Sequence, residues 1–181
     1  VTLSEENYLK TIFHLGRHDK ASVNTNAIAQ KMETKASSAT DMIKKLSEKG
    51  LLDYQKYKGV KLSENGRLAA IKVIRKHRLW EVFLVNKLSF SWDEVHEVAE
   101  QLEHIKSEKL TLELESFLDY PTQDPHGDPI PDSNGSIPST QKLLLAKVKQ
   151  GHQCICVGVK DSSSEFLKYL DKYKIALGSQ I

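Results

Sequence analysis

The fold class is decided by residues 51–62, which have the sequence LLDYQKYKGVKL. Their composition predicts two short strands around a turn at Lys58-Gly59. The apolar residues before this stretch recur at helical spacing instead. Two short helices followed by a lysine-rich hairpin are typical of a winged helix-turn-helix. In that fold the second helix of the pair lies in the major groove of DNA and the hairpin touches the backbone beside it.

Helices are expected on both sides of the hairpin. Upstream, the expected segments are residues 4–17, capped by Ser4; residues 25–32, begun by Thr25 or Asn26; and residues 37–49, begun by Ser37 or Ser38 and stopped by Gly50. Downstream, residues 63–66 lead into a long helix that ends near Asn86. Ser91 and Glu94 have capping-box spacing and open an acidic helix, and a last helix covers residues 107–118.

The net charge of +2 conceals two segments of opposite sign. Residues 20–66 hold nine lysines against five acids, whereas residues 88–120 hold two lysines against nine acids. Ordinary solvated faces would not by themselves segregate charge in this way. We therefore expect an anionic partner for the first segment and cations for the second.

The expected recognition helix and hairpin carry side chains suited to DNA. Lysine favours contact with phosphate, while serine, threonine and aspartate at a helix start can reach base edges. The alternative is that the serines only cap the helix and the lysines are only solvated. The candidate DNA-binding residues are Lys35, Ser37, Ser38, Thr40, Asp41, Lys44, Lys56, Lys58 and Lys61.

The acidic helix also carries a metal-binding pattern. His96, Glu100, Glu103 and His104 occupy an arc of roughly 100° on a helix, and apolar residues occupy the other side. Nineteen residues before His96, His77 and Glu81 lie one helical turn apart. One such pair is usually just a polar helix face. Two sets on neighbouring helices favour ligands for a divalent first-row metal ion.

Proline separates the helical part of the chain from the rest. All five prolines lie between Pro121 and Pro138, which predicts a linker or extended arm. Beyond it we expect strands at residues 143–148 and 154–159, a short helix at 162–172 and the start of a further strand at Ile175. The expected division is residues 1–66, 67–120, 121–139 and 140–181, and we expect the polypeptide to continue past Ile181.

Cys154 and Cys156 are the two cysteines of the chain. So close a pair rarely closes a disulfide, and they are expected to be thiols of a reduced compartment. The sequence shows neither a signal peptide nor an apolar run of membrane-spanning length. We expect a cytoplasmic protein without a membrane partner.

The chain resembles the diphtheria toxin repressor family of metal-dependent transcription repressors over residues 4–181. Four stretches carry the resemblance: NYLKTIF at 7–13, HRLWEVFL at 77–84, HEVAEQLEH at 96–104 and DPHGDPIP at 124–131. The resemblance implies a mainly α fold with little β structure. It comprises a winged helix-turn-helix, a helical metal-binding and dimerisation domain, and a partial SH3-like domain at 140–181. It also implies a homodimer on palindromic operator DNA, with no small-molecule substrate.

The same resemblance assigns metal ligands by position and implies about two ions per chain. Asn7, Glu100, Glu103 and His104 match the activating site, and His77, Glu81 and His96 match an ancillary site. Asp124 and His126 match linker ligands of some manganese-responsive members. Asp161 or Glu165 is a candidate for a further ligand. Apolar stripes between residues 67 and 118 are expected to form the dimer contact, and they include Leu79, Val82, Phe83, Leu102 and Ile105.

The expected ion is Mn²⁺ or Fe²⁺. Asn7 stands where manganese-type members usually carry aspartate, and Lys10 stands where one branch has a carboxylate. Glu100 stands where iron-type members tend to have sulfur, and this harder ligand favours Mn²⁺. Two other functions stay open: a metal-independent winged-helix regulator and a helical di-metal enzyme. The second would want Glu-x-x-His on two separate helices, whereas Glu103 and His104 are adjacent.

Overall fold

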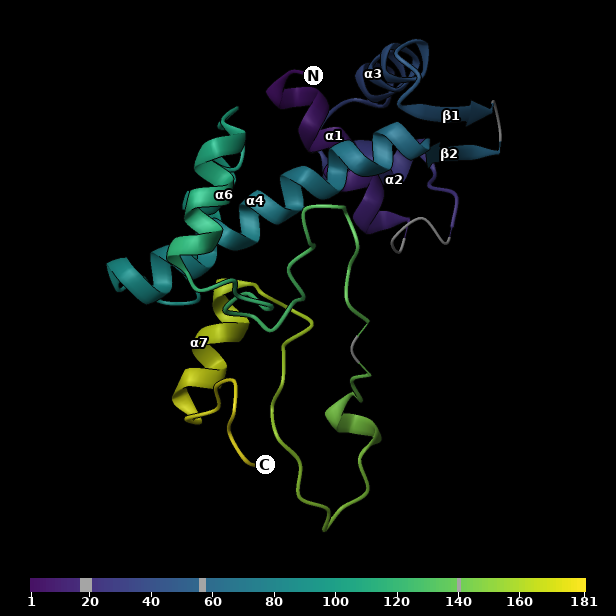
Figure 1. The fold of residues 1–181 in the computed structure, drawn as a ribbon. Coiled ribbons are helices and arrows are strands. Elements are labelled where there is room, and N and C mark those ends of the chain that lie inside the picture. The colour runs from purple at the N-terminus through teal and green to yellow at the C-terminus, as the bar shows by residue number, and fades with distance from the viewer. Residues whose placement is uncertain (17–20, 56–57, 140) are drawn as a thin grey trace. The chain divides into compact units, whose positions relative to one another are not determined.

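The computed structural model describes residues 1–16, 21–55, 58–139 and 141–181. They form two compact units, Val1–Ile74 and Arg75–Ile181. The long helix α4 (Glu64–Leu88), labelled in Figure 1, contributes to both units, since the boundary at Ile74 falls within it. The described part of the chain is mainly helical, as expected. None of its helices combines the length and the hydrophobicity that crossing a membrane would require.

The first unit begins with three helices, α1 (Leu3–Leu15), α2 (Thr25–Lys31) and α3 (Ala36–Glu48). The predicted segments are confirmed to within a few residues, but the predicted caps of α1 and α3 are wrong. Thr2 rather than Ser4 caps α1, because its hydroxyl accepts from the Glu5 amide while Glu5 accepts from the Thr2 amide. Helix α3 begins at Ala36 without a side-chain cap, so Ser37 and Ser38 lie within its first turn.

The predicted hairpin is present as strands β1 (Leu52–Gln55) and β2 (Gly59–Leu62). They pair antiparallel with Leu52 opposite Leu62 and Gln55 opposite Gly59. Gly59 is therefore the first residue of β2 rather than part of the turn. Val23 adds a bridge to Val60, which attaches the chain before α2 to the wing. Winged-helix architecture is thus formed within the first unit.

Helix α4 starts in close contact with the end of the α3–β1 connection. A Cβ atom on Gly66 would lie 1.9 Å from the carbonyl oxygen of Leu51. Ser63 also donates through its hydroxyl to the carbonyl of Gly50. Only glycine allows this approach of helix and loop, which sets where α4 leaves the winged domain.

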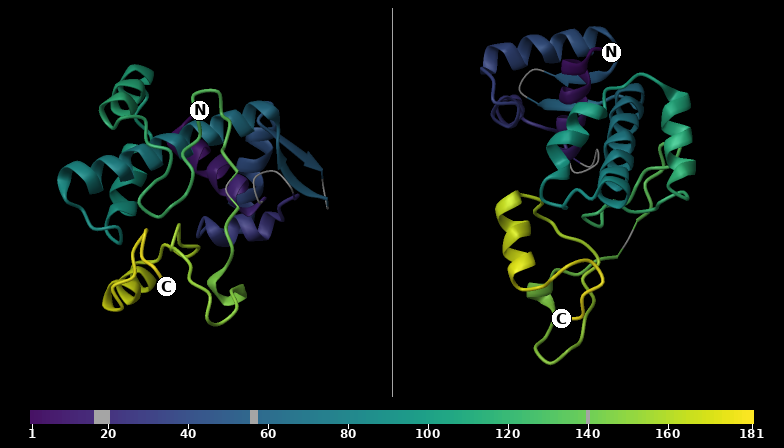
Figure 2. Two further views of the ribbon diagram at one scale, coloured as in Figure 1. Left: turned by 60° about the horizontal axis from the view of Figure 1, so that its bottom comes forward. Right: turned by 90° about the vertical axis from the view of Figure 1, so that its left-hand side faces the viewer.

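In the second unit, α6 (Glu108–Phe117) lies alongside the C-terminal half of α4 (Figures 1 and 2). Leu79 and Val82 of α4 pack with Leu114 of α6 and with Ile130 from the proline-rich segment. Helix α5 (Val95–Leu102) packs Val95 and Ala99 against Leu84. These contacts bury Leu79 and Val82 within one chain. The expectation that they belong to an apolar dimer surface is therefore wrong.

The turn before α5 differs from the predicted capping box. Glu94 accepts from both the amide and the hydroxyl of Ser91, but the helix begins only at Val95. Ser107 caps α6 as expected, because its hydroxyl accepts from the Leu110 amide. His77 and Glu81 thus lie on α4, and His96 lies on α5, which packs against α4.

Beyond the prolines, the predicted helix is present as α7 (Ser164–Lys172), but the two predicted strands are wrong. Residues 143–148 contain the 3₁₀ turn η1 (Leu145–Lys147). Residues 154–159 form an isolated bridge between Ile155 and Gln180, with backbone hydrogen bonds from Cys154 and Cys156 to residues 178–181, but no strand. A strand needs neighbours along its length to form a ladder, and Figure 2 draws the described part of residues 141–181 without a strand arrow.

Candidate metal centre

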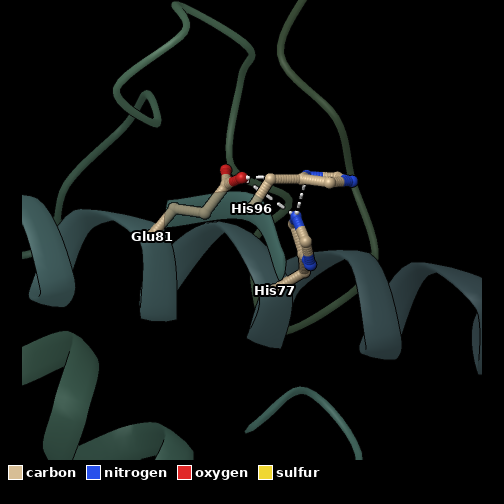
Figure 3. A group of neighbouring side chains, drawn as sticks. All are labelled: His77, Glu81 and His96. Carbon is tan, nitrogen blue, oxygen red and sulfur yellow. Dashed lines mark hydrogen bonds and ion pairs between the residues drawn. The ribbon is translucent and has the colours of Figure 1, made fainter. Parts of the chain in front are cut away.

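Two helices bring His77, Glu81 and His96 together. Figure 3 shows His77 and Glu81 on one face of α4 and His96 reaching them from α5. The His77 Nε2 atom lies 3.0 Å from Glu81 Oε1 and 3.2 Å from His96 Nδ1. His96 Nδ1 in turn lies 3.3 Å from the same Glu81 oxygen. Three ligand atoms of two kinds thus converge on one point, which suits a divalent first-row ion.

The second oxygen of Glu81 faces a different group. His126 Nδ1 lies 3.6 Å from Glu81 Oε2. Ligand atoms of Glu81, Asp124 and His126 all lie within 4.8 Å of one another, and all three residues are buried. Glu81 therefore belongs to two candidate sites at once. The spacing of the sequence did not predict that the proline-rich segment would supply the partners of this carboxylate.

Electrostatics inside the centre favour protonated imidazole in the metal-free protein. Burial opposes a charge on His77, but hydrogen bonds from its ring to Glu103 and Glu81 outweigh burial and raise its pKa to about 9. Burial would raise the pKa of Glu81, yet its imidazole partners hold that pKa well below the usual range. A metal ion would replace protons here, because both demand the same lone pairs.

Glu103 orients His77. Its Oε2 lies 2.6 Å from His77 Nδ1, and both residues are buried. A carboxylate only accepts, so Nδ1 carries the proton and Nε2 faces Glu81. A carboxylate that fixes the other nitrogen of a histidine ligand is a common arrangement in metal sites.

The remaining residues of the predicted activating site are spread over the second unit and α1. Glu103 Oε1 lies 3.4 Å from His104 Nε2, and half-exposed Glu100 lies 3.5 Å from His96 Nε2. Asn7 lies on α1 of the first unit. The structure thus brings Glu103 and His104 together and links Glu100 to His96. A shared site with Asn7 stays a prediction.

Arg78 holds the proline-rich segment against α4. Its Nε lies 3.4 Å from Asp124 Oδ2, and its guanidinium also donates to the carbonyl of Pro129. Burial and the nearby charge of Glu81 raise the pKa of Asp124 to about 6 against the effect of Arg78. Sequence reasoning missed Arg78, because a buried arginine cannot be distinguished from a solvated one by spacing alone.

The two candidates for a further ligand are exposed. Asp161 accepts from the Ser163 amide before α7, and Glu165 lies in the first turn of that helix. Neither joins the ligand groups found among the described residues.

Most of the predicted DNA-binding side chains are exposed on the first unit. Thr40 is the exception, because its hydroxyl donates to the carbonyl of Ala36 within α3 and it is half-buried. Asp41 and Lys44 form an exposed pair at 3.9 Å. Lys56 lies outside the described residues. The exposed members are Lys35, Ser37, Ser38, Asp41, Lys44, Lys58 and Lys61.

Two family models match consecutive parts of the chain. Residues 1–60 match the iron-dependent repressor N-terminal DNA-binding domain, and residues 63–132 match the iron-dependent repressor metal-binding and dimerisation domain. The chain belongs to the iron-dependent repressor family.

Individual relatives agree with this assignment. The iron-dependent repressor IdeR of Mycobacterium tuberculosis is 35% identical over 126 residues, which are 70% of this chain and 54% of that protein. This chain thus matches about half of that relative's length. An uncharacterised HTH-type regulator of Methanocaldococcus jannaschii, MJ0568, is 32% identical over 116 residues, which are 64% of this chain and 93% of that protein.

Solved structures share the fold over nearly all of this chain. A manganese-dependent transcriptional repressor in complex with manganese has a TM-score of 0.84 and 36% identity, and the match covers 97% of this chain and 81% of that one. ScaR with bound Zn²⁺ has a TM-score of 0.81 and 35% identity, with coverage of 98% and 82%.

Proposed function

We propose that this chain is a divalent-metal-dependent transcriptional repressor that controls metal homeostasis genes. The observation that carries the proposal is the buried carboxylate of Glu81, which faces imidazole groups on both sides, in a chain that also contains a winged-helix unit. In this proposal residues 1–66 bind DNA and residues 67–120 bind metal and dimerise. Residues 121–139 link them to a C-terminal domain at 140–181, and no part is enzymatic.

Mn²⁺ or Fe²⁺ is the proposed ion, at about two per chain. Imidazole nitrogen and carboxylate oxygen suit both ions, and the absence of a sulfur ligand from the proposed set favours Mn²⁺. One ion is held by His77, Glu81 and His96, with Asp124 and His126 available on the far side of Glu81. The activating ion is held by Glu100, Glu103, His104 and Asn7.

The proposed switch depends on a ligand set divided between two units. Without a cation, the carboxylates of Glu100 and Glu103 repel each other. A divalent ion bound with them and with Asn7 would tie the winged unit to the dimer. The recognition helices would then be held at the spacing that a palindromic operator requires.

Asn7→Ala tests this switch most directly. Glu103→Gln should also abolish metal-activated operator binding, but Glu103 touches His77 and its loss would disturb both sites. Asn7 lies on a different unit, so its loss should abolish activation while His77, Glu81 and His96 still bind metal. His77→Ala should weaken activation without removing it. If His77→Ala abolished activation and Asn7→Ala did not, the two assigned roles would be exchanged.

A homodimer through the second unit is also proposed. Large apolar side chains are exposed along its helices, more than solvation favours. These are Leu88, Leu110, Leu112 and Phe117 on the helices and Ile105 in the connection between α5 and α6. Sedimentation of the metal-free protein at micromolar concentration should give about twice the chain mass, and Phe117→Asp with Leu112→Asp should give a monomer. A monomeric parent would exclude this interface.

The test of the whole proposal is operator binding measured with Mn²⁺, Fe²⁺, Zn²⁺ and Co²⁺ in turn, and with chelator. We expect tight binding only with metal, and calorimetry should find about two ions per chain. Equal operator affinity with and without metal would favour the metal-independent regulator instead.

A further inference from the structure

His126 is held by its own turn and by two segments that are distant in sequence. Its Nε2 lies 2.7 Å from the backbone carbonyl of Trp92, and its amide donates to Asp124 Oδ1 at 2.9 Å. Its own carbonyl accepts from the Val159 amide at 3.0 Å. A carbonyl oxygen cannot donate, so Nε2 carries the proton. The Nδ1 atom, which faces Glu81, is left to bind metal.

The C-terminal segment packs directly against this loop. Gly127, at φ +85°, comes so close to the chain at Val157 and Gly158 that a Cβ atom would lie 2.4 Å from the Val157 carbonyl oxygen. The ammonium of Lys142 also donates to the carbonyl of Gly127. The backbone beside His126 therefore lies between α4 and the C-terminal segment.

Trp92 connects the same histidine to helix α7. Its ring is stacked on the His126 imidazole, with 6.4 Å between centroids and 10° between planes. Its indole Nε1 donates to the carboxylate of Asp171 at 3.0 Å. The neighbouring Asp93 accepts from Ser164 at 3.2 Å and pairs with Lys168 at 3.4 Å. Thus α7 is attached to the turn whose carbonyl fixes His126.

We propose that Trp92 is a positioning residue that couples the docking of α7 to metal binding by Glu81, Asp124 and His126. The inference rests on the proposed metal-binding function. Docked α7 holds the Trp92 turn, the turn holds the Nε2 proton of His126, and Nδ1 is thereby aimed at Glu81. Since coupling is reciprocal, metal bound at this site must hold α7 in place equally.

Two variants each remove one partner of the hydrogen bond between the Trp92 indole and the Asp171 carboxylate: Trp92→Phe and Asp171→Ala. Trp92→Phe removes the indole donor but keeps a ring and the backbone carbonyl. Trp80→Phe is its matched control, because Trp80 is the other tryptophan and packs against Phe83 in the core. Lys172→Ala is the control for Asp171→Ala, as an exposed residue on the same helix.

Two measurements on the full chain test the coupling. By titration calorimetry with Mn²⁺, both variants should bind the His126-dependent ion about tenfold more weakly than the parent and controls. The double variant should be no weaker, since both changes break one link. By hydrogen exchange with mass spectrometry, Mn²⁺ should slow exchange across α7 in the parent and much less in the variants. If Trp92 and Asp171 only stabilised the fold, their replacement would speed amide exchange in α7 by the same factor with and without Mn²⁺.

The outcomes separate the two proposals. If the parent and His126→Ala bound Mn²⁺ with the same affinity and number of ions, the proposal that His126 is a metal ligand would be wrong. If His126→Ala lost an ion but Trp92→Phe and Asp171→Ala bound like the parent, only the coupling would be overturned. Equal α7 exchange with and without Mn²⁺ in the parent would overturn it as well.

Discussion

Among the described residues, Val1–Ile74 buries one charged side chain, Glu5, whereas Arg75–Ile181 buries seven titratable or charged ones. In the first unit Lys45 and Lys49 neutralise Glu5 directly, at 3.0 and 2.8 Å. In the second unit the buried carboxylates share imidazoles that can give up protons. The buried acid of the first unit is thus neutralised by fixed charges, whereas in the second unit a cation could take the place of the protons.

The largest expected effect comes from removing the carboxylate that both ligand groups share. Glu81→Gln should lower Mn²⁺ affinity by at least about 100-fold, because ligation is lost on both sides. Mn²⁺ should raise the unfolding temperature of the parent but not of the variant, measured by differential scanning calorimetry. Glu97→Gln, an exposed acid on α5, is the control. If Mn²⁺ still raised the unfolding temperature of Glu81→Gln, the buried Glu81 carboxylate would not be required for metal binding, and the proposed difference between the two units would be wrong.

The second prediction concerns the rigid geometry of the first unit. An ordinary exposed Gly→Ala change within a helix is stabilising by about 1 kcal/mol. Gly66→Ala should instead be destabilising by about 1–3 kcal/mol, because its Cβ would overlap the Leu51 carbonyl. Urea unfolding measures this, with Asn65→Ala as the neighbouring control. If Gly66→Ala were more stable than the parent, the close approach of Gly66 to the Leu51 carbonyl would be wrong.

The third prediction tests the self-contained charge balance of the first unit. Hydrogen bonding to Lys49 lowers the pKa of Glu5 to about 2, against burial and with help from Lys45. A depressed carboxylate pKa contributes stability that is fully present above about pH 4.5 and is lost as pH falls toward 2. Glu5→Gln should therefore be destabilising by about 1–2 kcal/mol at pH 7.

The same comparison made at low pH supplies the internal check. The gap between parent and Glu5→Gln in urea unfolding should narrow below pH 4.5 and be nearly closed at pH 2. Glu48→Gln, an exposed acid on α3, should show no such gap. A gap that stayed constant with pH would assign the effect to packing rather than to charge.

The smallest expected effect at physiological salt is on DNA affinity, and it comes from replacing the two wing lysines Lys58 and Lys61. Each phosphate contact contributes roughly 0.9 to the slope of log affinity against log salt. Lys58→Ala and Lys61→Ala together should thus lower that slope by about 2, for specific and non-specific DNA alike. Lys72→Ala removes an exposed lysine outside the predicted interface and should leave the slope unchanged. An unchanged slope in the double variant would remove the wing from the interface.

Local signals were sufficient for most elements of the fold. Helical spacing predicted the helices to within a few residues, although α5 begins at Val95 and ends at Leu102, before Glu103 and His104, which were expected on it. The composition of residues 51–62 predicted the wing. The caps of α1 and α3 and the C-terminal strands were predicted wrongly. Thr2 and Ser4 are equally good caps in isolation, and a strand forms only where a partner pairs with it. Neither distinction is present in the local sequence.

The sequence by itself determined the candidate metal-binding pair within one helix, because His77 and Glu81 are brought together by helical spacing alone. Only the tertiary structure decided that the two oxygens of Glu81 face different groups, with His126 arriving 45 residues later in the chain. The same is true of Arg78 beside Asp124 and of Trp92 beside Asp171. Contacts between distant segments depend on how whole elements pack, and that packing is a property of the folded chain rather than of any short stretch.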